Sequence, residues 1–433
     1  MWISKSKKLA LRSVTPRKEN PKKKLVGRAP DVTEIEFTPQ ELFGAMARCS
    51  HLHPVNPEIV TFESECSRHL VSMHVDNSAE DFFLLPSVKR LKDSSRSHFV
   101  GVVGDGIAYL QMIRDGYVWC DHFENLSPSS DPETRRRPDF VFNRPGGTDV
   151  ALMESKATQG THRSGFLGIV EKGYNDQVSP HLGTEIGGSF ASHGFSIGSW
   201  MKSPSKAELH VSHTAVSANS ETSDGPGDAG FVRLGNYQTV LSLMFGPRIA
   251  FAARAGRWLS SEVGLLTADW LDQKWLLGFP TPYLGPRFWA GPPAQDLADY
   301  GYLGWASWPQ VNEFALELNV AEAVFKAFSI ETIATDPLAF LEPMDANLIA
   351  RAKENGGAVF PDGFAVLGTD KIKTHVSNWN PVTGKIERKQ PTVAPGYADK
   401  PIFDITREAL GWRHDTEHEE GEATLYLTYR LND

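Results

Sequence analysis

The chain has 433 residues, of which 40% are hydrophobic and 22% charged, and a formal net charge of −9. This composition is ordinary for a globular protein, no run is long and apolar enough to span a bilayer, and three cysteines are too few for a disulfide framework. These features exclude a membrane-spanning protein and a disulfide-stabilised secreted domain. They predict a cytoplasmic protein of mixed α/β class with more than one domain.

The N-terminal segment is strongly basic. Residues 1–28 contain ten Lys and Arg residues and a single acidic residue, Glu19. Because the segment is also poor in apolar residues, we predict that residues 1–30 form a disordered basic arm. Two roles remain open for it: binding of phosphate groups through counterion release, or solvation of the chain by a charged tail.

Two helices and a strand are predicted before residue 125. Thr38-Pro39-Gln40-Glu41 combines an N-cap, a proline at the first helical position and a capping-box glutamate, which predicts a helix over residues 38–48. Residues 104–117 have apolar positions at helical spacing and end at Gly116, which suits a C-terminal cap. Residues 118–123 are predicted to form a strand.

The most informative stretch is a predicted β-hairpin over residues 137–156. Its two apolar segments are joined by Pro145-Gly146-Gly147-Thr148, and consecutive glycines favour a tight two-residue turn. A turn at these glycines pairs positions whose numbers add up to 293, which places Asp139 opposite Glu154. Since side chains alternate along a strand, Lys156 is expected on the same face as Glu154.

Charges at one end of an apolar hairpin have two interpretations. Burying two carboxylates and an ammonium is costly unless a metal or substrate pairs with them, which favours a functional site. The alternative is a surface hairpin whose strand ends carry an exposed Glu/Lys pair.

Pro138-Asp139 followed by Glu154-Ser155-Lys156 resembles the motif of the PD-(D/E)XK nuclease superfamily, whose members share a restriction-endonuclease-like fold. The resemblance covers residues 95–250. It implies a core in the order helix, three strands, helix and strand, with the second helix at residues 167–178 and the fourth strand at residues 208–216. His210 and His213 on that strand are expected on opposite faces, as packed or surface residues.

The resemblance also implies an activity, hydrolysis of phosphodiester bonds by a Mg²⁺-dependent nuclease, with Mn²⁺ able to substitute. Asp139 and Glu154 would bind the metal together with the Ser155 carbonyl, and Asp105 would help to hold a second ion from near the start of its helix. Lys156 would orient the attacking water. DNA is the expected substrate, as in most of the superfamily, and restriction of foreign DNA, or defence against it, is the expected role.

The rest of the chain is assigned by pattern alone. Residues 38–250 are predicted to form the nuclease-like domain, and residues 251–433 a mainly helical, Trp-rich module for recognition or oligomerisation, with a helix at residues 310–328. Six tryptophans of this region favour a hydrophobic core or protein interface over a platform for stacking bases: Trp258, Trp270, Trp275, Trp289, Trp305 and Trp308.

A different class of function also stays open. The chain can be a non-catalytic nucleic-acid-binding or assembly protein that retains the nuclease fold. The intact Asp139, Glu154 and Lys156 favour the enzyme. On the enzyme hypothesis, replacing Lys156 with alanine is expected to abolish cleavage without unfolding the protein.

Overall fold

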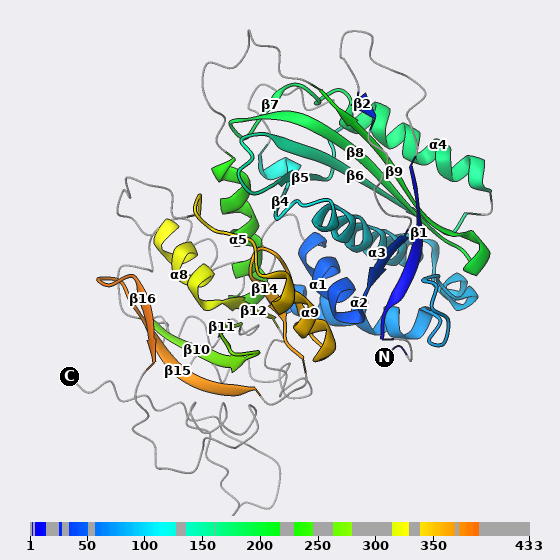
Figure 1. Ribbon diagram of the computed structural model, residues 1–433. Coiled ribbons are helices and arrows are strands. Elements are labelled where there is room, and N and C mark those ends of the chain that lie inside the picture. Colours follow the sequence, from blue (N-terminus) through cyan, green and yellow to red (C-terminus); the bar gives the residue numbers. More distant parts are fainter. Residues whose placement is uncertain are drawn as a thin grey trace, which may run out of the picture.

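The computed structural model describes residue 2 and residues 5–13, 26–27, 34–50, 57–126, 136–160, 162–216, 229–245, 263–278, 314–328, 338–368 and 372–388. These residues form two β-sheets and the helices packed on them (Figure 1). The fold is mixed α/β, as predicted. None of the described helices is long and apolar enough to cross a membrane.

The first sheet has nine described strands in the order β3-β1-β9-β8-β6-β5-β4, with β2 added to β9 and β7 to β8. The β1–β9 and β6–β8 pairs are parallel, and the other pairs are antiparallel. The strands are β1 (Lys7–Ser13), β2 (Val26–Gly27), β3 (Glu34–Phe37), β4 (Trp119–His122), β5 (Phe140–Asn143), β6 (Val150–Thr158), β7 (Glu185–Ile186), β8 (Ser189–Met201) and β9 (Ala207–Ala215).

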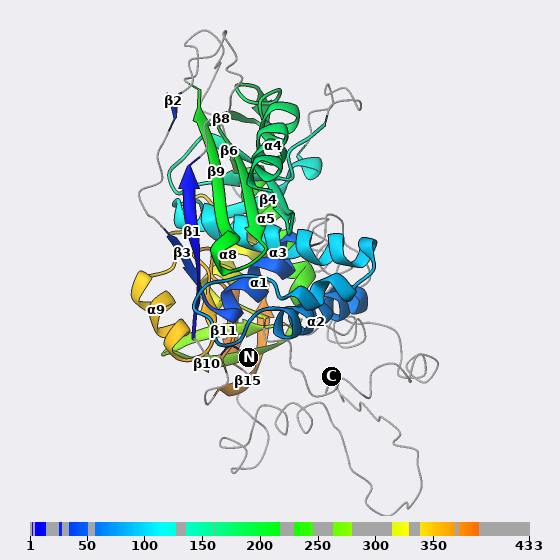
Figure 2. The same cartoon turned by 90° about the vertical axis from the view of Figure 1, so that its right-hand side faces the viewer.

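Seven α-helices lie among the described residues: α1 (Pro39–Cys49), α2 (Pro57–His74), α3 (Asp93–Arg114), α4 (Arg163–Gly173), α5 (Gly230–Phe245), α8 (Leu318–Ala327) and α9 (Ala346–Glu354). Short 3₁₀ turns occur at η1 (Pro86–Arg90), η2 (Phe123–Asn125) and η4 (Pro204–Lys206), and a π-helical turn, η3 (Tyr174–Val178), continues α4. Figure 2 shows α4 alongside β6, β8 and β9, with α1, α2 and α3 gathered at the other end of these strands.

The predicted elements around the hairpin are largely confirmed. α1 has the predicted capping box at Thr38, β4 matches the strand predicted at residues 118–123, and α4 with η3 covers the helix predicted at residues 167–178. The chain runs through α3, β4, β5, β6, α4 and β8, so a helix, three strands, a helix and a strand follow one another.

The strand predicted at residues 208–216 exists, but it is β9 and not the fourth strand of this series. The fourth strand is β8, which lies parallel to β6 after the α4 crossover. Its glycines and serines gave no strand pattern in the sequence. Gly194 and Gly198 are required there for packing, since a methyl group at Gly198 would lie 2.3 Å from Cγ2 of Val170 on α4.

The helix predicted at residues 104–117 is the second half of α3, which begins at Asp93. Asp105 therefore lies in the middle of the helix and not near its start. Polar residues in the first turns and glycines at 101 and 104 concealed the longer helix, because both weaken the apolar periodicity. Gly116 has φ +89°, as expected for a C-terminal cap.

The prediction of a disordered arm over residues 1–30 is wrong for its described parts. Residues 7–13 form β1 inside the first sheet, and residues 26–27 pair with β9. Lys7 is fully buried, and its ammonium donates to the carbonyl of Ala79. A lysine-rich composition concealed the alternating Leu9 and Leu11, which fill the core. Residues 14–25 and 28–30 lie outside the described residues.

The prediction of a mainly helical C-terminal region is also wrong where the structure describes it. A seven-stranded antiparallel sheet has the order β13-β14-β12-β11-β10-β15-β16, and α8 and α9 are the only described helices after residue 250. Its strands are β10 (Val263–Trp270), β11 (Gln273–Leu277), β12 (Phe314–Glu317), β13 (Ala358–Val359), β14 (Phe364–Val366), β15 (Lys373–Asn380) and β16 (Lys385–Arg388). The helix predicted at residues 310–328 is β12 followed by α8, because a short apolar run buried on both faces has no distinguishing period.

The described tryptophans of this region belong to the core. Trp270 and Trp275 are 3% and 0% exposed, and their rings meet edge to face at 5.5 Å. This agrees with the predicted core role and leaves neither ring free to stack on a base. Trp258, Trp289, Trp305 and Trp308 lie outside the described residues.

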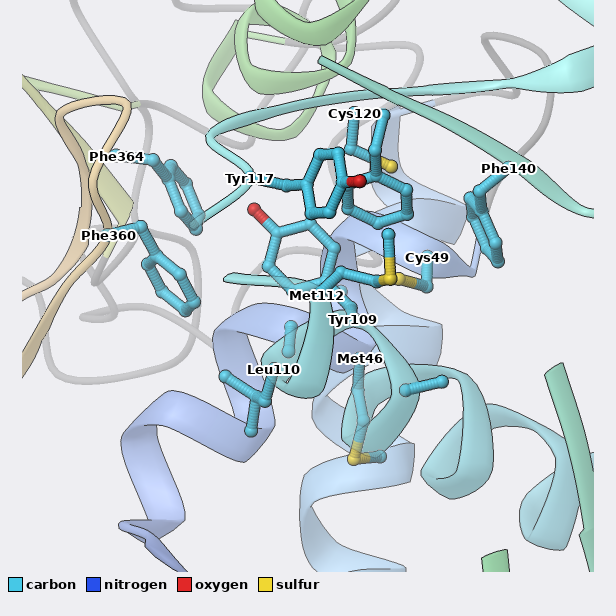
Figure 3. Close-up of a cluster of buried hydrophobic side chains, with 14 of the residues drawn as sticks. Met46, Cys49, Tyr109, Leu110, Met112, Tyr117, Cys120, Phe140, Phe360 and Phe364 are labelled. Carbon is cyan, nitrogen blue, oxygen red and sulfur yellow. The ribbon is translucent and has the colours of Figure 1, made fainter. Parts of the chain in front are cut away.

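One hydrophobic core connects the two sheets. Figure 3 shows its centre, where Tyr109 of α3 faces Phe360 and Phe364 from the β13–β14 turn. The ring centroids of Tyr109 and Phe360 are 6.0 Å apart, and those of Phe360 and Phe364 are 5.5 Å apart. Aromatic contacts of this kind fix the second sheet against α3.

A buried ion pair reinforces this connection. Nη1 of Arg48 on α1 donates to Oδ2 of Asp362 at 2.6 Å, and the two side chains are 3% and 0% exposed. Asn236 on α5 donates to the same oxygen at 2.9 Å, and Tyr237 donates to the Asp362 carbonyl at 3.1 Å. Three segments distant in the sequence therefore share one hydrogen-bonded network.

Replacing Arg48 with methionine is expected to lower the free energy of unfolding by about 3–5 kcal/mol, because Asp362 would remain buried without its countercharge. Chemical denaturation of the full chain measures this change. As a control, Arg351→Ala removes an ion pair of 2.7 Å whose side chains are 47% and 88% exposed, and should cost less than about 1 kcal/mol. Equal effects of the two substitutions would contradict a structural role for the buried pair.

Candidate functional site

The β5–β6 hairpin has the predicted register. Phe140 pairs with Met153, Val141 with Leu152 and Phe142 with Ala151, so paired numbers add up to 293. Both strands are buried along their paired length. The charged residues at their ends are therefore held in place by an apolar, hydrogen-bonded frame.

The turn of the hairpin differs from the predicted one. Gly147 N donates to the Arg144 carbonyl at 3.0 Å, which makes Pro145 and Gly146 the central residues. Only Gly146 of the two glycines has a positive φ, +66°. Proline fixes its own φ near −65° and favours a turn with glycine after it, so Pro145 decides the turn while the strand pairing keeps the register.

Asp139 directly precedes β5, and its side chain is directed to the backbone of β6. Its Oδ2 accepts the amide N–H of Ser155 at 2.8 Å. The carbonyl of Asp139 accepts from Phe123 N at 3.1 Å, which attaches η2 to the same point. Asp139 therefore lies beside the Glu154-Ser155-Lys156 segment. The observed strand pairing ends at Phe140 and Met153, so the predicted pairing of Asp139 with Glu154 is not part of it.

Glu154 and Lys156 form an ion pair within β6. The Lys156 ammonium donates to Oε1 of Glu154, whose side chain is 0% exposed, while the Lys156 side chain is 28% exposed. Oε2 of Glu154 is buried and has no hydrogen-bond partner among the described residues. The expectation that Lys156 can be removed without affecting the fold assumed that its ammonium makes no core contact. The structure contradicts that premise, because loss of Lys156 would leave a buried carboxylate unpaired.

Asp105 reaches the site from the other face of the sheet. A methyl group at Gly104 would lie 2.3 Å from Cβ of Ala157, so only glycine permits this contact between α3 and β6. Ala157 and Ser155 project from the face opposite Glu154 and Lys156, because side chains alternate along a strand. The half-buried Asp105 is thus close to Ser155 and Asp139 and is separated from Glu154 by the strand.

Burial and neighbouring charge change the acidity of these groups. Burial, followed by the negative charge of Asp139, raises the pKa of Asp105 to about 7 against the opposing effects of Ser155 and Lys156. Burial also raises the pKa of Asp139, and Lys156 opposes this increase. Burial lowers the pKa of Lys156, although Asp139 and Asp105 favour its charged form. A carboxyl group with a pKa near neutrality can exchange a proton at physiological pH.

The structure adds residues that the motif alone did not single out. Glu124 on η2 contributes to the raised pKa of Asp139, and Arg136 contributes to the lowered pKa of Lys156, so both charges are near the site. Gly173 lies against it from α4. No local pattern pointed to Glu124 or Gly173, because their proximity to the site depends on tertiary packing.

Two residues after α4 hold the segment that leads to Asp139. Nε2 of Gln177 donates to the Arg137 carbonyl at 2.8 Å, and the ring of His181 contacts the Arg136 carbonyl through Nε2 at 3.0 Å. The contact of Gln177 positions the backbone next to Asp139.

The carboxylate oxygens of the site are the type of ligand that a hard divalent cation prefers. The buried Oε2 of Glu154, without a hydrogen-bond partner in the described part of the chain, is an oxygen that a cation or donor would stabilise. The three predicted metal ligands, Asp139, Glu154 and Asp105, are not close enough together to form a complete cluster. No group of three or more His, Cys, Asp or Glu side chains does so within the residues described.

Comparisons of the chain with models of protein families, with curated proteins and with solved structures found no match. The residues of the site are therefore the basis for inferring a function.

The pKa of Asp105 predicts how stability depends on pH. Because the folded state holds this proton more tightly than the unfolded chain, ionisation of Asp105 opposes folding as the pH rises from about 4 to about 7. Asp105→Asn should remove this contribution to the loss of stability between pH 4 and pH 7. Denaturation midpoints of both proteins between pH 4 and pH 8 measure it, and identical pH profiles would contradict the raised pKa.

Proposed function

We propose that the chain is a divalent-metal-dependent nuclease that hydrolyses phosphodiester bonds in DNA. The observation that carries the proposal is the position of Asp139, Glu154 and Lys156 at the adjoining ends of β5 and β6, held within a buried sheet. A fold retains buried charges at a cost, and function is the usual reason.

The arrangement of elements supports the proposal. α3, β4, β5, β6, α4 and β8 follow the order of the PD-(D/E)XK core, and the parallel pairing of β6 with β8 is what a crossover through α4 produces. Asp139 directly precedes β5 and Glu154-Ser155-Lys156 lies in the neighbouring strand β6, which matches where the superfamily has its motif. A role in restriction of foreign DNA, or defence against it, is part of the proposal through this resemblance.

The carboxylates of Asp139 and Glu154, with the main-chain carbonyl of Ser155, would hold Mg²⁺ or Mn²⁺. Asp105, on the opposite face of β6, would not join this ion and would help to hold a second one. A bound cation polarises the phosphate and lowers the pKa of a water molecule. Glu154 is the ligand whose free oxygen already lacks a partner among the described residues.

Lys156 would position the attacking water and stabilise the negative charge that develops on the phosphate. The Lys156 ammonium is bound to Glu154 in the structure. It would be released to bind the water and the phosphate when Glu154 binds a metal ion. Asp105, with a pKa of about 7, would accept or supply a proton near neutral pH. Each role needs the charge that the buried site preserves.

One observation favours a second function, a nucleic-acid-binding or assembly protein that retains the fold without catalysis. The Glu154 carboxylate is 0% exposed and already paired with Lys156. A permanently closed pair would neither bind a cation nor reach a phosphate. Metal distinguishes the two functions, since a binding protein should retain intact nucleic acid equally in Mg²⁺ and in EDTA.

Cleavage of plasmid and single-stranded DNA in Mg²⁺, Mn²⁺ or EDTA tests the enzyme. Asp139→Asn and the double variant Glu154→Gln/Lys156→Met should each reduce the cleavage rate by about 10²-fold or more. The double variant removes both charges of the Glu154–Lys156 pair, so the buried Glu154 is not left without its partner and the fold is expected to persist. Asp93→Asn, on an exposed side chain of α3, serves as the control. Cleavage that survives both active-site changes would refute this assignment.

A further inference from the structure

The carboxylate of Glu154 lies sealed beneath the end of α4. Its side chain is 0% exposed. At Gly173, the last residue of α4, a methyl group would lie 3.2 Å from Cγ of Glu154 and 3.3 Å from Cε of Lys156. The helix therefore rests directly on this ion pair, and a phosphodiester has no access to Glu154 in this arrangement.

We propose that α4 is a gate over the Glu154–Lys156 pair, closed in this structure, which swings away to admit the substrate. The identity of the substrate that the gate admits rests on the proposed nuclease function. The movement of α4 does not depend on that function. Four features of the helix support the inference: its separate apolar contacts, the polar surface beneath it, an ion pair at its start and a π-helical turn at its end.

The apolar contacts of α4 form a cluster separate from the main core. Phe166 and Val170 of the helix are buried against Trp200 of β8, and the rings of Phe166 and Trp200 stack with centroids 5.9 Å apart. None of these three residues belongs to the main hydrophobic core. Moving α4 would thus disrupt a small satellite cluster, and local opening of such a unit costs less free energy than global unfolding.

The sheet surface beneath α4 is polar. Glu154 pairs with Ser196 and Ser196 with Ser212 across three neighbouring strands, so the three side chains share the face that α4 covers. Ser196 donates to the Val170 carbonyl at 2.8 Å. Oε2 of Glu154, Oγ of Ser212 and Nδ1 of His210 are buried with no hydrogen-bond partner in the described chain. Burial of such groups destabilises the closed position relative to one that water can reach.

An ion pair fixes the first residue of α4. Nε and Nη2 of Arg163 both donate to Oε2 of Glu208 on β9, each at 3.2 Å. The same oxygen contacts Nε2 of the buried His210 at 2.6 Å. Just before the helix, the Trp200 indole donates to the Gly160 carbonyl at 2.8 Å. These polar contacts hold the start of α4 on the sheet and would have to break when it moves.

The other end of α4 has the features of a hinge. The helix passes at Gly173 into the π-helical turn η3, a conformation that often marks a functional bend. Gln177 in that turn remains bound to the Arg137 carbonyl near Asp139. Gln177 therefore anchors η3 beside the site, and α4, with Gly173 at its end, would pivot about this turn once the Arg163–Glu208 ion pair breaks.

Carbodiimide labelling of carboxyl groups, followed by mass spectrometry, tests the gate without relying on nuclease activity. Glu154 should react slowly in the wild type and about fivefold faster in Arg163→Ala and in Glu208→Gln, because each removes the ion pair. Asp93, whose side chain is 91% exposed, is the internal reference and should react equally in all proteins. Arg351→Ala, which breaks an exposed ion pair elsewhere, is the control variant.

Hydrogen exchange of residues 163–173 provides the second readout. A methyl group at Gly168 meets no atom within 4 Å, so Gly168→Ala should slow exchange in α4 through helix propensity alone. Exchange in α3 should not change. Unchanged labelling of Glu154 in both ion-pair variants, or opening of α4 only together with α3, would overturn the gate.

Plasmid cleavage in Mg²⁺ separates the gate from the nuclease. Faster cleavage by Arg163→Ala together with faster Glu154 labelling supports both. Faster labelling without cleavage by any variant supports the gate and contradicts the nuclease. Cleavage that is equal in all variants while Glu154 labelling stays unchanged retains the nuclease and rejects the gate.

Discussion

The free-energy cost of burying charged side chains inside an apolar sheet constrains the rest of the structure. Glu154 and Lys156 project from the central strand β6, and Asp139 approaches the same strand through the Ser155 amide. Their solvation in water is lost, so each charge needs a partner at a fixed position. The hairpin register supplies that position, and the glycines at 104 and 173 allow α3 and α4 to enclose it from opposite faces.

The same principle explains how the C-terminal half is joined to the site. The Arg48–Asp362 pair is as deeply buried as Glu154, but its remaining polar atoms are hydrogen-bonded to Asn236 and to backbone groups. A satisfied network of this kind makes a rigid frame. The Glu154 network is incomplete, with an unpartnered oxygen among the described residues. We infer that the complete network supports the fold, whereas the incomplete one is retained for binding.

Sequence patterns correctly predicted the elements whose structure is determined by residues close together in the chain. The capping box at Thr38 and the pairing of Asp139 with the Glu154-Ser155-Lys156 segment could be read from adjacent residues. Strand β8 and the second sheet could not, because their glycines, serines and short apolar runs acquire a role only through packing on α4 and α3. The same reason concealed Gly173, whose contact with Glu154 joins residues from two elements.

The central claim is that Asp139 and Glu154 form a cation site, and binding of Mn²⁺ tests it most directly. The loss of the electron paramagnetic resonance signal of free Mn²⁺ measures binding to the full chain. The account predicts that the wild type binds the ion and that Asp139→Asn and Glu154→Gln/Lys156→Met bind it at least about tenfold more weakly. Equal binding by all three proteins, or none by the wild type, would contradict it.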